Sequence, residues 1–234
     1  MQKTAIVTGG TRGIGRAILA KLLSEGFHVY TFGSSVDSIM KLKAENPAET
    51  TKGQLVVNQV DASIKREIKD WALGISGQFT SLQILVNNAG RFISRSIGEE
   101  EEGAFEQMIN TNLASAYHTT RAFLPQLKEG KGHIFNICST ASITAYTNGG
   151  SYCISKFGLL GMSKVLREEL KPHRVRVTSI LPGATLTDSW AEAALPSSRF
   201  MKVDDVAAVL WNAFSLSDSC VVEEILMRPL EGDI

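Results

Sequence analysis

Cysteine is scarce in this chain of 234 residues, which has only Cys138, Cys153 and Cys220. The number is odd and the spacings match neither a zinc site nor a CxxC pair, so a disulfide framework is not expected and a reducing compartment is the default. A net charge is also lacking, because 24 Lys and Arg balance 24 Asp and Glu. A nucleic-acid-binding protein needs surplus basic residues to offset phosphates, so the balance argues against that class of partner.

Long apolar stretches are absent too. No run approaches the ~18 residues of a membrane-spanning helix. The first apolar stretch, after Met1-Gln2-Lys3, is too short for the core of a signal peptide. The composition, with 44% hydrophobic and 21% charged residues, is that of a globular chain and not a disordered one. We therefore expect a cytoplasmic protein without a membrane partner.

Short β-rich runs alternate with longer segments of helical periodicity. Strands are expected at residues 4–8, 28–32, 55–60, 84–86, 132–138, 175–181 and 224–227. Helices are expected at residues 13–24, 36–46, 64–75, 104–127, 152–170 and 203–216. The acidic run at residues 99–102 (EEEE) is interpreted as the solvated start of a helix.

This alternation predicts βαβ units, and no linker or repeat divides the chain. The expected fold is α/β: one doubly wound Rossmann domain over residues 1–234, with a parallel seven-stranded sheet and helices on both faces.

The first expected strand leads through a glycine-rich turn into a helix, and the turn reads Thr8-Gly9-Gly10-Thr11-Arg12-Gly13-Ile14-Gly15. Side chains at Gly9 or Gly13 would block a pyrophosphate, and Gly15 lets the helix pack closely on the strand. The helix N-terminus offers N–H groups to phosphates. The spacing is GxxxGxG, not GxGxxG, and the alternative is a helix start with flexible glycines. The strand–turn–helix context favours a dinucleotide site.

The second strand indicates which dinucleotide. An NAD site usually has an acid at the end of this strand, but the chain continues Gly33-Ser34-Ser35, and Asp37 comes too late. Arg12 in the glycine turn could bind a 2′-phosphate, with neutral donors from the serine hydroxyls. The alternative is that Arg12 is a solvated loop residue. We predict NADP(H) as the cofactor.

Tyr152 and Lys156 are four residues apart in an expected helix, so they share one face. A nearby ammonium favours the phenolate and is expected to lower the phenol pKa, which suits proton transfer to a substrate oxygen. Ser139 follows an expected strand, where open parallel sheets bind ligands, and its hydroxyl could donate to a carbonyl oxygen. An isolated Ser in that place would otherwise be a turn former.

Together these residues resemble the short-chain dehydrogenase/reductase family, and the resemblance covers nearly the whole chain. The glycine turn is similar to the family's TGxxxGxG motif. Further resemblances imply cofactor contacts at Asp61, at Asn87-Asn88-Ala89-Gly90, and at Pro182-Gly183 with Thr187. The family's four catalytic positions fall on Asn112, Ser139, Tyr152 and Lys156.

The resemblance implies a role for each catalytic residue. Tyr152 would be the general acid in reduction, and Lys156 would hold the nicotinamide ribose and lower the Tyr152 pKa. Ser139 would orient the substrate carbonyl, and Asn112 would hold a water that connects Lys156 to solvent. Family members commonly pair the long helix and the Tyr-bearing helix across a twofold axis, which implies a homodimer or homotetramer.

The end of the chain and the segment 152–158 resemble the bacterial sepiapterin reductase branch and its broad-specificity relatives. The substrate lid, at about residues 187–201, is short and carries Trp190. Trp190 could stack on a flat ring such as a pterin, or it could pack the lid onto the body.

The expected function is NADPH-dependent reduction of a small-molecule ketone, with sepiapterin-like compounds or diketones as candidates. One alternative is a 3-oxoacyl-thioester reductase, for which Arg91, Arg95 and Arg199 could form a basic groove. The alternative from another class is an NADP-binding sensor or scaffold without catalysis.

Overall fold

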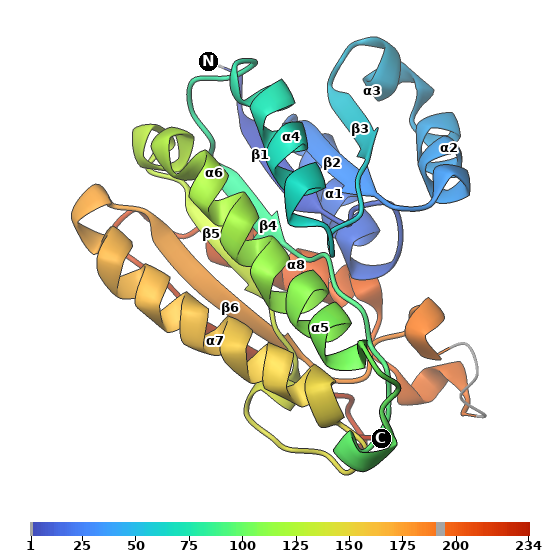
Figure 1. Cartoon of the computed structure of the whole chain (residues 1–234). Coiled ribbons are helices and arrows are strands. Elements are labelled where there is room, and N and C mark those ends of the chain that lie inside the picture. Colours follow the sequence, from blue (N-terminus) through green and yellow to red (C-terminus); the bar gives the residue numbers. More distant parts are fainter. Residues whose placement is uncertain (1, 191–194) are drawn as a thin grey trace.

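A computed structural model describes residues 2–190 and 195–234. Its seven strands pair in parallel in the order β3-β2-β1-β4-β5-β6-β7 (Figure 1). The strands are β1 (Thr4–Thr8), β2 (His28–Gly33), β3 (Leu55–Gln59), β4 (Ile84–Asn87), β5 (His133–Ile137), β6 (Arg176–Pro182) and β7 (Glu224–Met227). The predicted doubly wound α/β fold is confirmed.

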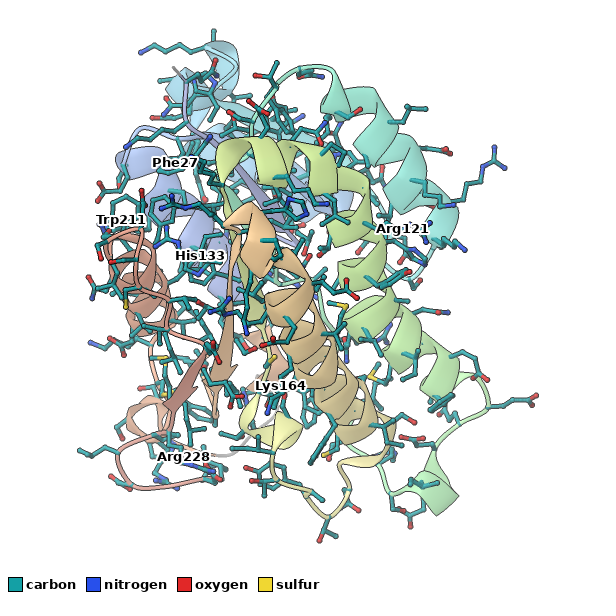
Figure 2. The ribbon with its side chains drawn as sticks, turned by 90° about the vertical axis from the view of Figure 1, so that its left-hand side faces the viewer. Phe27, Arg121, His133, Lys164, Trp211 and Arg228 are labelled. Carbon is teal, nitrogen blue, oxygen red and sulfur yellow. The ribbon has the colours of Figure 1, made fainter. Side chains whose placement is uncertain are left out.

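The helices cover both faces of this sheet. They are α1 (Gly13–Ser24), α2 (Val36–Glu45), α3 (Pro47–Thr51), α4 (Lys65–Ser76), α5 (Ala104–Ile109), α6 (Ser115–Gly130), α7 (Gly150–Leu170) and α8 (Val203–Phe214). Apolar residues of α1, α2 and α8 pack on one face, and those of α4, α6 and α7 on the other. Figure 2 shows Phe27 and Trp211 on one side of the sheet and Arg121 on the other.

Successive side chains of a strand point to opposite faces of the sheet and so join the two apolar layers in turn. In β1, Ala5 and Val7 join the layer of α1 and α8, while Ile6 between them joins the layer of α4 and α6. All three side chains are fully buried. This period of two on a sheet covered on both faces explains why the strands read as nearly continuous apolar runs.

Two features differ from the sequence prediction. Pro47, expected only to stop α2, also begins the short helix α3, where its fixed φ suits the first helical position. The helix expected over residues 104–127 extends to Gly130 and is interrupted by a π-helical turn at Asn110–Ala114. Such turns insert one residue into a helix and are frequent at functional sites.

The sheet topology places the candidate site. β1 lies between β2 and β4, so the chain crosses over in opposite directions on either side of β1. In open α/β sheets, ligands bind outside the carboxyl ends of the strands at this switch point. In the part of the chain that the structure describes, no helix is long and apolar enough to span a bilayer.

Candidate active site

The glycine turn after β1 has the backbone that the sequence predicts for a phosphate cradle. Gly9 and Gly13 have φ of 65° and 55°, which side chains rarely adopt. A Cβ on Gly15 would lie 2.5 Å from the carbonyl oxygen of Gly9, so the helix could not start this close to the strand. The extended Arg12 precedes α1 without a side-chain cap, and the N–H groups of the first turn have no intrahelical acceptor. These features fit the pyrophosphate of a dinucleotide.

The segment after β4 is bonded to this turn. The hydroxyl of Thr8 accepts from the backbone N–H groups of Asn88 and Ala89, both at 2.9 Å. The side-chain amide of Asn88 donates back to the carbonyls of Thr8 (2.9 Å) and Gly9 (3.1 Å). Asn88 and Ala89 therefore lie directly against the glycine turn, and Thr8 is the residue that holds them there.

Hydroxyl groups gather where β2 ends. Ser35 caps α2 by accepting from the Ser38 N–H, and the Ser38 hydroxyl donates to Thr11 at 3.1 Å. Ser34 and Ser35 are exposed, as is Asp37 in the first turn of α2. Ser38 was missed by the sequence reading, and only its spacing from the cap residue could have indicated it.

Arg12 lies at the same corner, and its side chain is 73% exposed. It forms an ion pair with Asp188 at 3.6 Å. Asp61, the expected adenine contact, accepts from both the N–H and the hydroxyl of Ser63 and so shapes the turn before α4.

Tyr152, Lys156 and Ser139 come together at the carboxyl ends of β5 and β6. Lys156 is only 6% exposed, and its ammonium donates to the carbonyl of Ile137 at 2.8 Å. The same ammonium lies 5.8 Å from the centre of the Tyr152 ring. Ser139 follows β5 by two residues, and its hydroxyl is near enough to the Tyr152 phenol to act on the phenol pKa.

The electrostatics of this group correct one expectation. The pKa of Tyr152 is raised to about 12, since burial outweighs the hydrogen bond from Ser139, which lowers it. The predicted lowering of this pKa by Lys156 is therefore wrong. Burial instead lowers the pKa of Lys156 to about 8. Near neutral pH both groups therefore keep their protons.

Ser139 is oriented by its own turn. It caps the 3₁₀ turn Thr140–Ser142, where its hydroxyl oxygen accepts from the Ala141 N–H at 3.1 Å. The Ser142 hydroxyl accepts in turn from the Ser139 N–H at 3.2 Å. Because the Ser139 oxygen is used as an acceptor, its proton can be directed outward.

Asn112 lies in the π-helical turn and is 1% exposed. Its side chain accepts from the Arg91 N–H (2.7 Å) and donates to the Arg91 carbonyl (3.0 Å) and to Ser155 (2.9 Å). Gly90 lies between Asn112 and Lys156. A Cβ on Gly90 would be 3.3 Å from the Asn112 amide oxygen and 3.8 Å from the Lys156 nitrogen. Asn112 thus ties the loop after β4 to the helix that carries Lys156.

The segment after β6 returns to the glycine turn. Gly183 donates from its N–H to the Met227 carbonyl at 2.8 Å, and a Cβ there would be 3.0 Å from Pro229. Thr187 reaches the turn itself, since a Cβ on Gly13 would lie 3.3 Å from its methyl group. Thr187 therefore lies against the glycine turn, while Gly183 packs against the segment that follows β7. The expected lid spans residues 187–201, of which 191–194 lie outside the described residues.

Aromatic rings pack beside Tyr152. Phe92 packs edge-on against Tyr152 with ring centres 4.7 Å apart, and Trp190 lies 6.0 Å from Phe92. Phe200 is 5.5 Å from Trp190 on its other side. Trp190 therefore packs against the loop after β4 through Phe92 and against its own lid segment through Phe200. Phe92 was missed by the sequence reading, because no pattern relates it to a helix 60 residues later.

Two other interpretations from the sequence are tested by the structure. Glu100 of the acidic run is half-buried and bonds to Ser151, so the run is not simply a solvated helix start. Arg199, a candidate for a basic groove, is paired with Glu231 at 3.1 Å. Among the described residues, no three His, Cys, Asp or Glu side chains are grouped to hold a metal.

The family model described as short chain dehydrogenase matches residues 3–196. The chain belongs to this family, whose members are oxidoreductases that act on alcohols or carbonyl compounds with a nicotinamide cofactor.

Among similar proteins, the sepiapterin reductase of Chlorobaculum tepidum is 30% identical, and the match covers 100% of this chain and 99% of that protein. The structure is also similar to an alcohol dehydrogenase from Thermococcus sibiricus complexed with 5-hydroxy-NADP, with a TM-score of 0.90, 26% identity and coverage of 100% and 99%. A metagenomic short-chain oxidoreductase in complex with NADP has a TM-score of 0.82, 31% identity and coverage of 97% and 96%.

Proposed function

We propose that this protein is an NADPH-dependent carbonyl reductase with Tyr152 as its general acid. When bound, NADPH would supply the hydride that reduces the carbonyl carbon. The Tyr152 hydroxyl donates its proton to the carbonyl oxygen, and the Ser139 hydroxyl donates a hydrogen bond to the same oxygen. Lys156 would bind the ribose hydroxyls beside the nicotinamide. Asn112 holds the Gly90 loop against the helix that carries Lys156, and it would also hold a water that connects Lys156 to solvent.

One observation carries this proposal: a phenol, a hydroxyl and a buried ammonium converge at the carboxyl edge beside a phosphate cradle. The Lys156 ammonium lies 5.8 Å from the centre of the Tyr152 ring and is held at the Ile137 carbonyl, and the Ser139 hydroxyl acts on the Tyr152 pKa. A buried ammonium costs free energy unless it is paired and hydrogen-bonded, so its place beside the phenol favours an enzyme over a sensor without catalysis.

The preference for NADPH is supported at the end of β2. Gly33 ends this strand, so no carboxylate stands where a ribose 2′-hydroxyl would bind. Arg12, the hydroxyls of Ser34 and Ser35 and the N-terminus of α2 form a corner suited to a 2′-phosphate. The two NADP-type complexes among similar structures agree with this choice.

Arg12→Ala should raise the Kd for NADPH about tenfold and leave that for NADH unchanged. An equal effect on both cofactors would contradict the assignment.

The substrate that fits best is a small ketone attached to a flat ring. Phe92 and Trp190 form an apolar wall beside the Tyr152 ring, and such faces favour offset stacking. The similarity to a sepiapterin reductase agrees with a pterin-like ring. The rival substrate, a 3-oxoacyl thioester, would need a basic groove, and one of its three candidate residues, Arg199, is paired with Glu231.

The test is a substrate panel monitored by NADPH oxidation, with sepiapterin, simple diketones and a 3-oxoacyl thioester. Tyr152→Phe is the matched control, since it removes only the hydroxyl. We expect turnover with the ketones, and a loss of about 10³-fold in kcat in the variant at unchanged NADPH affinity. Full turnover by Tyr152→Phe would refute the catalytic assignment, and NADPH binding without any turnover would favour the sensor.

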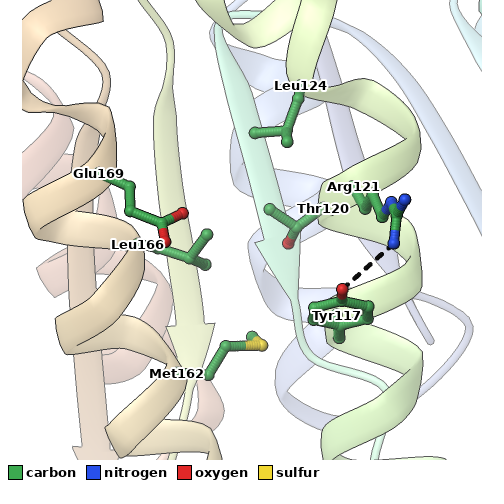
Figure 3. Close-up of a pocket in the computed structure, with 7 residues that line it drawn as sticks. All are labelled: Tyr117, Thr120, Arg121, Leu124, Met162, Leu166 and Glu169. Atoms are coloured by element: carbon green, nitrogen blue, oxygen red, sulfur yellow. Dashed lines mark hydrogen bonds between the residues drawn. The ribbon is translucent and has the colours of Figure 1, made fainter.

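The outer faces of α6 and α7 are the proposed contact with a second copy of this chain. A groove of about 220 Å³ lies between the two helices. Figure 3 shows Arg121 on one side of it and Glu169 on the other. Tyr117 (47%) and Val165 (55%) are exposed on these faces. A twofold axis along the groove would bring unlike charges together and cover the apolar side chains.

The oligomeric state is measured by light scattering. We expect a dimer or tetramer for the native chain and a smaller species for Val165→Glu. Leu73→Glu is the matched control, because Leu73 is 78% exposed on α4, away from this groove. A monomeric native chain would contradict the proposed contact.

A further inference from the structure

The helix that carries Tyr152 and Lys156 begins without a cap of its own. α7 starts at Gly150, and the residue before it, Gly149, has no side chain that could accept from the first turn. Tyr152 is the third residue of this helix, so it lies in the turn whose N–H groups lack intrahelical acceptors. Fraying of this turn would move the phenol directly.

The missing cap comes from another part of the chain. One carboxylate oxygen of Glu100 accepts from the Ser151 N–H at 2.7 Å, and the other accepts from the Ser151 hydroxyl at 2.5 Å. Ser151 is only 1% exposed, and it lies 51 residues after Glu100. Two charge-assisted bonds to one residue fix direction as well as distance, and a carboxylate at a helix N-terminus is favoured by the dipole.

The backbone around this contact is built for close approach. Gly150 has φ of 35°, and a Cβ there would lie 2.6 Å from the Arg95 carbonyl oxygen and would also collide with the Glu100 carboxylate. The loop between β4 and α5 therefore lies directly on the start of α7. The same loop presses Phe92 against the Tyr152 ring, so it holds Tyr152 from two sides.

We propose that Glu100 is a positioning residue for the reaction, which caps α7 from the β4–α5 loop and thereby sets the place of the Tyr152 hydroxyl. This inference rests on the proposed function. Because Glu100 bonds to Ser151 and not to the glycine turn, its loss should change the rate of the chemical step and leave cofactor binding intact. Small displacements of a catalytic group are enough to lower a rate by one or two orders of magnitude.

The experiment compares four full-length variants: Glu100→Ala, Glu100→Gln, Glu101→Ala and Tyr152→Phe. Steady-state kcat and KM are measured with the best ketone of the panel, and the NADPH Kd is measured by fluorescence. Glu100→Ala should lower kcat about tenfold, with KM and Kd within about twofold of the native values. Glu100→Gln keeps an oxygen that accepts from Ser151 and should recover most of the lost rate. Glu101→Ala, an exposed neighbour in the same acidic run, should behave as the native chain.

Equal kcat values for Glu100→Ala and Glu101→Ala would overturn the inference, as would a Glu100→Gln variant no more active than Glu100→Ala. If Glu100→Ala does not fold, Ser151→Ala carries the test, because it removes one of the two bonds and should lower kcat about threefold. An unchanged kcat in Ser151→Ala then overturns the inference. Failure of the proposed function is seen separately, as full turnover by Tyr152→Phe.

Discussion

The body of the sheet and its carboxyl edge are built in opposite ways. Between α1, α8 and the strands, apolar side chains such as Leu22 and Phe135 are fully buried. At the edge, buried groups are polar: Asn87 bonds to Thr120 and Asn136, and Lys156 bonds to a backbone carbonyl. The amide oxygen of Asn87 has no partner within the described residues. The body thus contributes stability, while the edge holds polar groups at a cost in stability because they are needed for chemistry.

The strongest test of this contrast is Lys156→Met. Since burial lowers the Lys156 pKa from 10.5 to about 8, keeping the ammonium charged in the folded state costs about 3 kcal/mol below pH 8. Met removes this cost but leaves the Ile137 carbonyl unpaired. We expect kcat to fall about 10³-fold and the free energy of unfolding at pH 7 to rise by about 1–2 kcal/mol, measured by kinetics and urea denaturation.

The sign of this effect can be checked by pH. A group whose folded pKa is below its unfolded pKa releases its proton first in the folded state, so stability should rise between pH 8 and 10.5 in the native chain. That rise should be missing in Lys156→Met. A variant less stable than the native chain at pH 7 would show that the ammonium stabilises the edge.

In the body of the sheet, Phe27→Ala should lower the stability and leave kcat nearly unchanged, which is the opposite of Lys156→Met. Phe27 is fully buried and packs edge-on against Trp211 (6.2 Å) and Phe214 (5.8 Å). Its removal leaves a cavity, and the free energy of unfolding should fall by about 3–5 kcal/mol. The kcat of the folded fraction should remain within about twofold. Phe27→Leu, with a smaller cavity, should lose roughly half as much; a large drop in kcat in either variant would break the contrast.

Thr8→Val tests the boundary between the two regions. The substitution keeps the shape of Thr8 but leaves the Asn88 and Ala89 N–H groups without their acceptor. We expect a loss of about 1–3 kcal/mol in unfolding free energy together with a weaker NADPH Kd, followed by fluorescence. Thr8→Ser retains the hydroxyl and should keep both values. Unchanged NADPH affinity in Thr8→Val would mean that the turn does not depend on this hydroxyl.

The smallest expected effect is a pH dependence of the reductive reaction. With a pKa of about 12, Tyr152 stays protonated at neutral and mildly alkaline pH. Lys156, with a pKa of about 8, loses its charge first. The kcat/KM for ketone reduction should therefore fall above pH 8, by about tenfold per pH unit. Lys156→Arg remains charged and should show no such decline; a native profile that stays flat to pH 10 would contradict this origin.

The sequence predicts the body of the fold better than it predicts the carboxyl edge. Strand and helix periodicity, and a turn such as Thr8–Gly15, are local, so the layout of the sheet follows from neighbours along the chain. The positions of Phe92 and Glu100 depend on contacts with a helix more than fifty residues later. The raised pKa of Tyr152 depends on how deeply the phenol is buried, and spacing to Lys156 carries no information about that.

The π-helical turn at Asn110–Ala114 has a further consequence for the long α5–α6 rod. An extra residue there shifts the angular phase of everything that follows by about 100°. Deleting one residue from the turn would leave the composition of the helix almost intact, yet it would swing Phe123 and Leu127 out of the interior and Asn112 away from Arg91. The number of residues in this turn, more than the identity of any side chain, sets the rotation of α6 relative to α5 about the helix axis.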